Sequence, residues 1–376
     1  MTTKWVGRFV VASGVALAAA AFSTPAAAQK IENSYICVFK ANAVAKDAVP
    51  GEARRSVNAQ GGQVKHVYRH AIRGFAANMN ARAVENMRRA NPRIAYCEQD
   101  QVMTGFPKPD KPGKPGGGDG GGGGGTSTQQ TPWGITRVNG GVSGATGRAF
   151  VIDSGIDGSH PDLNVNEGLS AYFVGRNWDD QNGHGTHVAG TIAAIDNNIG
   201  VVGVAAGAEV VAVRVLDRRG SGSTSGVIAG VDYVASVGQQ GDVANMSLGG
   251  GISTTLDNAV VNASGTVKFV LAAGNENQDA NNSSPARANG NNIYTVSAMD
   301  SSDRIASFSN YGNPPVDFAE PGVSILSTYK GDGYATLSGT SMAAPHLAGI
   351  LLLGQVRSGG QLATDKDNTK DTIGIH

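Results

Sequence analysis

The sequence predicts an α/β fold for residues 131–376, in which a mainly parallel sheet is covered by helices on both faces. Short apolar runs at 148–153, 208–216, 242–247 and 267–273 are typical of buried strands, and helical patterns at 186–196, 223–237, 255–264 and 342–353 lie among them. This alternation favours a three-layer arrangement around a parallel sheet. Ligands bind beyond the carboxyl ends of the strands in such sheets.

A smaller α+β domain is predicted in front of it. Residues 34–105 have the order strand, helix, strand, strand, helix, strand, with helices expected at 50–61 and 81–90 and strands at 34–39, 64–70, 74–79 and 94–98. This is the order of the ferredoxin-like split βαβ motif.

Residues 1–28 have the features of a secretory signal peptide. Lys4 and Arg8 precede an apolar run that ends at Phe22, and small residues follow up to Ala28. The apolar run is short for a membrane span, so cleavage after Ala28 is favoured over an uncleaved anchor. We therefore expect a secreted protein, extracellular or periplasmic, with no membrane attachment after cleavage.

The two cysteines of the chain, Cys37 and Cys97, both lie in strand-like runs of the small domain. Exported proteins form disulfides, so we expect the two to pair across neighbouring strands. Residues 131–376 contain no cysteine.

Residues 106–130 are predicted to be a linker, because prolines and lysines are followed there by a run of glycines. The four expected segments are thus 1–28, 29–105, 106–130 and 131–376. Residues 29–105 contain twelve Lys and Arg against six Asp and Glu, a net charge of +6, and residues 131–376 contain thirteen against twenty-two, a net charge of −9. Opposite charges favour contact between the two domains. The chain as a whole is balanced, 30 against 30, so no nucleic-acid partner is expected.

Four polar residues are expected to meet at one edge of the large sheet. Asp153 ends a strand, Asn275 follows another, and His184 and Ser341 each lie at the entrance of a helix. An acid, a base and a hydroxyl nucleophile are the parts of a catalytic triad, in which the histidine takes the serine proton and the aspartate orients the histidine. The amide of Asn275 and the backbone N–H of Ser341 would stabilise the oxyanion.

Each of these residues also has a structural interpretation. Asp153 could cap a turn, Asn275 could adopt a left-handed turn conformation, and Ser341 could be the N-cap of an ordinary helix. His184 and His187 could bind a metal, but no third ligand stands at the spacing of a zinc protease. The coincidence of all four at such positions favours catalysis. We expect Pro345 to be tolerated because it falls in the first turn of the last helix.

The motifs resemble those of subtilisin-family serine proteases, closest to the proteinase K-like branch. They are VIDSG at 151–155, NGHGTHVAGT at 182–191, SLGG at 247–250, AAGN at 272–275 and GTSMAAP at 339–345. The resemblance implies a subtilisin-like fold, a triad of Asp153, His184 and Ser341, and Asn275 as oxyanion donor. The order Asp, His, Ser differs from that of α/β-hydrolases.

The resemblance also implies a substrate cleft and its control. An extended peptide would pair between two segments, beside the walls of the first specificity pocket; these residues are Gly220, Ser221, Gly222, Ser247, Leu248, Gly249, Ala272, Ala273 and Gly274. Since no acidic side chain is among them, we expect broad cleavage of polypeptide substrates after apolar or aromatic residues. Residues 29–105 resemble the family's inhibitory propeptide, which would act as an intramolecular inhibitor with residues 101–106 reaching the cleft.

Other expectations follow from the same resemblance. No cofactor is expected for catalysis, whereas structural calcium is possible near Asp317 and the carbonyl groups of residues 291–293. A cis peptide bond is expected at Ser284–Pro285, and the protein is expected to be a monomer. Glu320 departs from the pattern, because the family usually has a small residue there. The alternative function is a catalytically silent homologue that stays bound to its propeptide.

Overall fold

The computed structural model describes residue 1, residues 29–105 and residues 128–376. The predicted signal peptide and most of the predicted linker lie outside the described residues. Gln129 and Gln130, which the sequence analysis assigns to the linker, belong to the large domain, since the Gln130 N–H donates to the carbonyl of Gly200 at 2.8 Å. Within the described ranges, none of the helices has the length and apolar character needed to cross a membrane.

The small domain has the predicted order of elements. Its strands are β1 (Lys30–Phe39), β2 (Gln63–Tyr68), β3 (Gly74–Asn78) and β4 (Ile94–Gly105), and its helices are α1 (Val49–Asn58) and α2 (Ala81–Ala90). The antiparallel strands lie in the order β4, β1, β3, β2. Strand β4 is longer than expected, because its second half pairs with the large domain rather than with its own sheet.

The predicted disulfide is confirmed. Cys37 of β1 and Cys97 of β4 lie directly opposite each other in the antiparallel register, and their sulfur atoms are bonded.

The large domain is built on a ten-stranded sheet with the order β17, β18, β14, β13, β12, β10, β5, β8, β6, and β7 also pairs with β8. All neighbours are parallel except β17 and β18. The strand bounds are Ala149–Asp153 (β5), Asn164–Val165 (β6), Ala171–Tyr172 (β7), Glu209–Arg214 (β8), Val243–Met246 (β10), Lys268–Ala272 (β12), Ile293–Met299 (β13), Val316–Pro321 (β14), Arg357–Gln361 (β17) and Thr372–Ile375 (β18).

Helices cover both faces of this sheet, which confirms the three-layer prediction. Helices α4 (His184–Ala193) and α7 (Thr340–Leu353) share one core with Val151 of β5, whereas α5 (Thr224–Val237) and α6 (Thr254–Ala263) share the other with Phe150 and Ile152. Successive residues of a strand point to opposite faces, so β5 is buried on both. The remaining elements are α3 (Trp133–Arg137), β9 (Ser221–Ser223), β11 (Leu248–Gly250), β15 (Ile325–Tyr329), β16 (Gly333–Leu337) and 3-10 turns at Lys46–Ala48, Glu167–Leu169 and Ala280–Asn282.

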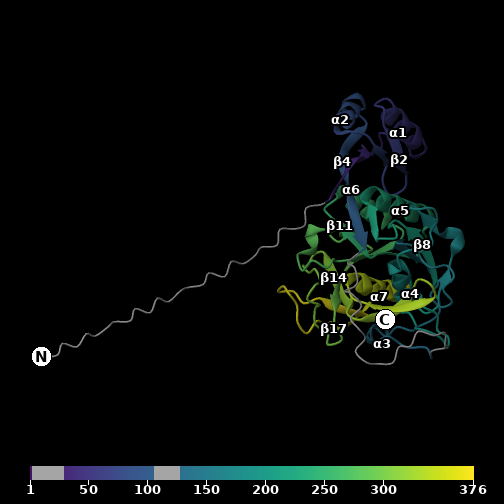
Figure 1. Ribbon diagram of the computed structural model, residues 1–376, viewed down its shortest axis with the longest axis vertical. Coiled ribbons are helices and arrows are strands. Elements are labelled where there is room, and N and C mark those ends of the chain that lie inside the picture. The colour runs from purple at the N-terminus through teal and green to yellow at the C-terminus, as the bar shows by residue number, and fades with distance from the viewer. Residues whose placement is uncertain (2–28, 106–127) are drawn as a thin grey trace.

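The small domain sits on the α5 and α6 side of the large one (Figure 1). Helices α1 and α2 lie farthest from the large domain, and strand β4 runs down past α6 toward β11. This arrangement brings the end of the small domain to the carboxyl edge of the large sheet.

The predicted cis peptide bond at Ser284–Pro285 is also present.

Candidate active site

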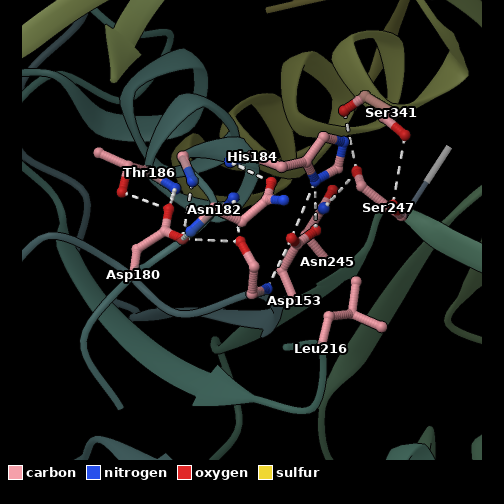
Figure 2. Close-up of polar contacts among 12 residues, drawn as sticks. Asp153, Asp180, Asn182, His184, Thr186, Leu216, Asn245, Ser247 and Ser341 are labelled. Carbon is pink, nitrogen blue, oxygen red and sulfur yellow. Dashed lines mark hydrogen bonds and ion pairs between the residues drawn. The ribbon is translucent and has the colours of Figure 1, made fainter. Parts of the chain in front are cut away.

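Asp153 and His184 form a buried pair at the carboxyl edge of the sheet. The Nδ1 atom of His184 lies 2.8 Å from Oδ1 and 3.0 Å from Oδ2 of Asp153, which is fully buried as the last residue of β5. Figure 2 shows the His184 ring between Asp153 and Ser341. Burial of the ring acts to lower the pKa of His184, but Asp153 outweighs burial and raises it above the ordinary value. The carboxylate therefore fixes Nδ1 as the donor and leaves Nε2 for proton transfer.

The loop before His184 is held by Asp180, which the sequence analysis did not single out. Its Oδ1 accepts the N–H groups of Asn182 and Gly183, each at 2.8 Å, and its Oδ2 accepts the N–H and hydroxyl of Thr186 at 3.0 and 2.7 Å. A carboxylate at a helix N-terminus satisfies free N–H groups there. An aspartate four residues before His184 was the available sequence signal.

Ser341 is the second residue of α7, whose N-cap is Gly339 rather than a serine. Pro345 lies inside the helix, beyond the first turn, so the expectation for it was wrong. Because proline has no N–H, the Ser341 carbonyl lacks its usual helical partner four residues on. The hydroxyl of Ser247 supplies the missing hydrogen bond at 2.8 Å. Ser247 in turn accepts from the side-chain amide of Asn245 at 2.8 Å.

The Ser341 hydroxyl donates to the carbonyl oxygen of Ser247 at 3.2 Å (Figure 2). The Nε2 atom of His184 is buried and has no hydrogen-bond partner within the described part of the chain. Nucleophile and base are thus adjacent but not hydrogen-bonded in this state, and such bonds commonly tighten when substrate binds.

Asn275 lies beside the N-terminus of α7. Its Oδ1 accepts the N–H and hydroxyl of Thr340 at 2.9 and 3.0 Å, which fixes the orientation of the side chain. Its buried Nδ2 has no partner among the described residues. A Cβ placed on Gly339 would lie 3.2 Å from this Nδ2 and 3.7 Å from the Ser341 nitrogen. Two N–H donors therefore border one small space that a side chain would fill.

His187 has a structural position. Its Nε2 contacts the carbonyl oxygens of Ile325 and Ala335 at 3.0 and 3.1 Å, which ties α4 to β15 and β16. Burial lowers its pKa to about 3, so the ring is neutral. The alternative of a metal site shared by His184 and His187 is therefore not favoured.

The predicted substrate segments hold the end of the small domain. Strand β4 pairs antiparallel with β9, with Thr104 opposite Ser221 and Met103 opposite Gly222. On its other side it pairs with β11, with Gly105 opposite Leu248 and Thr104 opposite Gly249. The Gly105 N–H also donates to the carbonyl of Gly220 at 3.0 Å. The chain enters the cleft as an added strand between two edges, which is how extended peptides are recognised by strand addition.

Side chains of this strand fit the cleft closely. Met103 is fully buried, and a Cβ on Gly250 would lie 2.7 Å from its sulfur atom. Glycine at 250 therefore leaves the room that the Met103 side chain occupies. A Cβ on Gly105 would lie 3.1 Å from Leu216 and 3.6 Å from Nδ1 of His184, so β4 runs directly past His184. The predicted approach of residues 101–106 to the cleft is confirmed for 101–105, and Phe106 lies outside the described residues.

The other predicted pocket segment, Ala272 to Gly274, lies beside Ser247 and the start of α7. Strands β10 and β12 are parallel with Met246 opposite Leu271, so Ser247, which follows β10, lies beside Ala272, the last residue of β12. The hydroxyl of Thr340 accepts the N–H of Gly274 at 3.1 Å. Gly220 to Gly222 and Leu248 to Gly249 thus contact strand β4, Ser247 contacts Ser341, and Gly274 contacts Thr340, whereas Ala272 and Ala273 are fully buried. Their role in substrate binding stays a prediction.

Three carboxylates fasten the small domain to helices α5 and α6. Asp100 of β4 accepts the N–H of Ser225 at 3.0 Å and its hydroxyl at 2.6 Å, in the first turn of α5. Glu98 accepts the hydroxyl of Ser253, the N-cap of α6. From the other side, Asp232 of α5 accepts the backbone N–H groups of Arg69, His70 and Ala71 at 2.7–3.1 Å.

A group of oxygen atoms near the start of the large domain could hold a cation. The carbonyl oxygens of Ile195 and Val201 both face the side chain of Gln129, at 2.8 and 3.3 Å. The fully buried carboxylate of Asp162 lies beside them, accepting from the Val201 N–H at 3.1 Å and from the Asn197 amide at 2.8 Å. Within the described residues no three His, Cys, Asp or Glu side chains gather at one point. Any metal site there would rest on the Asp162 carboxylate and on backbone carbonyl oxygens, with the Gln129 and Asn197 side chains presenting their amide nitrogens in this state.

Comparison with known families gives two matches. A model described as the subtilase family matches residues 150–368, and a model described as peptidase inhibitor I9 matches residues 24–104. The two matches coincide with the large and small domains.

Individual proteins similar to this chain point to the same family as the two models. The chain is 39% identical to the subtilisin-like serine protease AsES of Sarocladium strictum, over 77% of this chain and 72% of that protein. It is 40% identical to the alkaline serine exoprotease A of Vibrio alginolyticus, over 86% of this chain and 60% of that protein, and 36% identical to subtilisin E of Bacillus subtilis, over 86% and 80%. Among solved structures, a cold adapted subtilisin-like serine proteinase aligns with a TM-score of 0.57 and 42% identity, covering 64% of this chain and 96% of the other.

Proposed function

The chain belongs to the subtilase family of serine proteases, and we propose that it is a secreted endopeptidase that residues 29–105 hold inactive until they are removed. The observation that carries the proposal is the position of strand β4, which pairs with β9 on one side and with β11 on the other, as an extended substrate would. An inhibitor that imitates substrate requires a site able to bind one.

In the proposed reaction, the Ser341 hydroxyl attacks the carbonyl carbon of the peptide bond and His184 takes its proton through Nε2. Asp153 stabilises the imidazolium that forms. The negative charge on the carbonyl oxygen falls between Asn275 Nδ2 and the Ser341 N–H. His184 then gives the proton to the leaving amine, and a water molecule, activated by His184, hydrolyses the acyl-enzyme. Because only neutral His184 can act as base, activity should fall as the pH drops below its raised pKa.

We further propose broad specificity for apolar or aromatic residues before the cut. The segments that border the first pocket, Ser247 to Gly249 and Ala272 to Gly274, carry small or apolar side chains and no carboxylate that could pair with lysine or arginine. A digest of a peptide library with the processed enzyme should show cuts after Phe, Leu, Met and Tyr. A sharp preference for Lys or Arg would contradict this assignment.

Catalysis itself needs no metal in this proposal, but calcium would stabilise the fold. Asp162 offers a buried carboxylate that contacts Val201, and the carbonyl oxygens of Ile195 and Val201 share one partner, the Gln129 side chain. Carboxylate and carbonyl oxygens are the ligands that calcium prefers. At the position expected from the sequence, Asp317 accepts the Thr295 N–H at 2.8 Å, and burial raises its pKa to about 6. Because the carbonyl oxygens of Ile195 and Val201 accompany Asp162, we favour the Asp162 position.

Thermal unfolding of Ser341→Ala protein with calcium or with EDTA tests the two positions. Calcium should raise Tm of the parent and of Asp317→Asn, but not that of Asp162→Asn. The reverse pattern would move the site to Asp317, and no effect on any of the three would remove calcium from the proposal.

The activity is tested by expressing the full chain beside Ser341→Ala. The parent should separate residues 29–105 from the large domain and digest casein, and the variant should do neither. A parent chain that folds yet neither processes itself nor digests casein would favour the catalytically silent alternative.

A further inference from the structure

Strand β4 connects the disulfide to the active site. Cys97 lies near its beginning and is bonded to Cys37, and its last three residues, Met103 to Gly105, fill the cleft. In the small sheet, β1 lies between β4 and β3. The disulfide therefore fastens the strand that blocks the active site to the central part of the inhibitory domain.

The small domain depends on this bond more than a large domain would. Its core is a single cluster of twelve buried residues, of which Cys37 is one, and Cys97 packs against it. Small domains bury a smaller share of their surface, so their folded state is marginal without a crosslink. The cysteines are 60 residues apart, and a bond that closes a loop of this length removes much of the freedom of the unfolded chain.

A reductant would act on the small domain alone. Cys37 and Cys97 are the only cysteines in the sequence, so the catalytic domain has no thiol or disulfide of its own. A reductant would then weaken the inhibitor and leave the enzyme intact. Cys37 is 1% exposed and Cys97 is half-buried, so Cys97 is the more exposed residue of the pair.

We propose that the Cys37–Cys97 bond is a redox-controlled lock, and that its reduction by a dithiol releases strand β4 from the cleft. This inference rests on the proposed function, since it concerns how the inhibition of that site ends. A thiolate of the dithiol attacks the Cys97 sulfur, the bond between Cys97 and Cys37 breaks, and Cys37 leaves as a thiolate that takes up a proton. The second thiol of the reagent then closes its own disulfide and frees Cys97, so two electrons pass to the protein and the dithiol is oxidised.

The first test needs no proteolytic activity. Hydrogen exchange is measured by mass spectrometry on oxidised full-length Ser341→Ala protein, with and without dithiothreitol, and the intact mass after alkylation reports both free thiols. Reduction should speed exchange in β1 and β4 at least tenfold while β10 and α7 stay unchanged. Three results would overturn the proposal. Exchange in β1 and β4 could stay unchanged in the reduced protein, exchange in α7 could accelerate equally, or dithiothreitol could fail to reduce the bond in the folded chain.

The second test measures access to Ser341 in parent protein purified with residues 29–105 still bound, through its rate of labelling by a fluorophosphonate. Dithiothreitol should raise this rate at least tenfold, whereas the Cys37→Ser/Cys97→Ser double variant should label fast without reductant and show no response to it. A parent rate that reductant leaves unchanged would overturn the lock. If the reduced protein labels but hydrolyses no peptide, the proposed function fails and the lock still stands, so the two failures are distinguishable.

Discussion

The side-chain hydroxyl of Ser247 donates to the carbonyl oxygen of Ser341 at 2.8 Å, and the hydroxyl of Ser341 donates to the carbonyl oxygen of Ser247 at 3.2 Å. The first of these bonds replaces the helical hydrogen bond that Pro345 cannot make. Ser247 thus positions the nucleophile as well as bordering the cleft.

Replacing Ser247 by alanine should reduce kcat about tenfold or more, because the buried Ser341 carbonyl loses its partner and the first turn of α7 shifts. An unsatisfied buried acceptor costs about 1–3 kcal/mol, so Tm should fall as well. Ser247→Thr keeps the hydroxyl and should recover most of the kcat. A kcat in the alanine variant equal to that of the parent would refute the positioning role. Kinetics on the processed enzyme with a peptide p-nitroanilide measure the effect.

Asn275→Asp should lower kcat by about 10²- to 10³-fold with little change in KM, a size known for the corresponding donor of subtilisin. The substitution removes the Nδ2 donor but keeps the oxygen that accepts from Thr340. Asn275→Leu removes both and serves as the comparison: it should lose kcat to a similar degree and also lower Tm. If Asn275→Asp kept full kcat, Asn275 would have only the structural role.

Asp232→Asn should loosen the inhibitory domain about 10- to 100-fold, since three backbone N–H groups lose a charged acceptor worth about 1.5–3 kcal/mol. The rate at which Ser341 of the precursor reacts with a fluorophosphonate reports this loosening. Asp47→Asn is the matched control, because Asp47 is 96% exposed and lies 3.9 Å from Arg69. Equal rates in the two variants would show that the Asp232 bonds contribute nothing to inhibition.

Glu320→Gln should make the protein more resistant to alkaline pH. Glu320 is fully buried, and neither carboxyl oxygen has a hydrogen-bond partner among the described residues. Burial raises its pKa well above the ordinary value, with Arg137 opposing. The unfolded chain therefore loses this proton at lower pH than the folded one, so stability falls as the pH rises above the ordinary glutamate pKa.

The Glu320→Gln variant has no carboxyl proton to lose at this position. Its advantage in Tm over the parent should be small near pH 4.5 and grow by several degrees toward pH 9, measured in the Ser341→Ala background to prevent self-digestion. A difference in Tm that stays constant across this range would show that Glu320 does not titrate between the two states.

The positions of Asp153, His184 and Ser341 could be predicted from the sequence because each stands at a strand end or helix entrance, where a local pattern decides the position. Helix α2 and the strand that ends at Asp153 were predicted for the same reason. The length of β4 could not be predicted, because its second half is held by Ser221 to Ser223 and Leu248 to Gly250, far away in the chain. Contacts between distant segments leave no local periodicity.

Pro345 and Glu320 are two further features that the sequence could not explain, because each depends on a residue far away in the chain. The proline is accommodated inside α7 because Ser247 compensates for its missing N–H by donating to the carbonyl oxygen of Ser341, 94 residues away. The glutamate fits where the family has a small residue because Gly374 makes room, since a Cβ there would lie 2.3 Å from its Oε1. Neither compensation is visible near the residue that needs it.

The fit of Met103 beside Gly250 links the substrate specificity of the enzyme to its inhibition by β4, because the same part of the cleft serves both. A larger residue at 250 would narrow the cleft for foreign peptides and would also expel the strand that keeps the precursor silent. New specificity in this chain therefore has to arise as a pair of matched substitutions, one in the cleft and one in β4. A single change on either side would weaken the fit between β4 and the cleft.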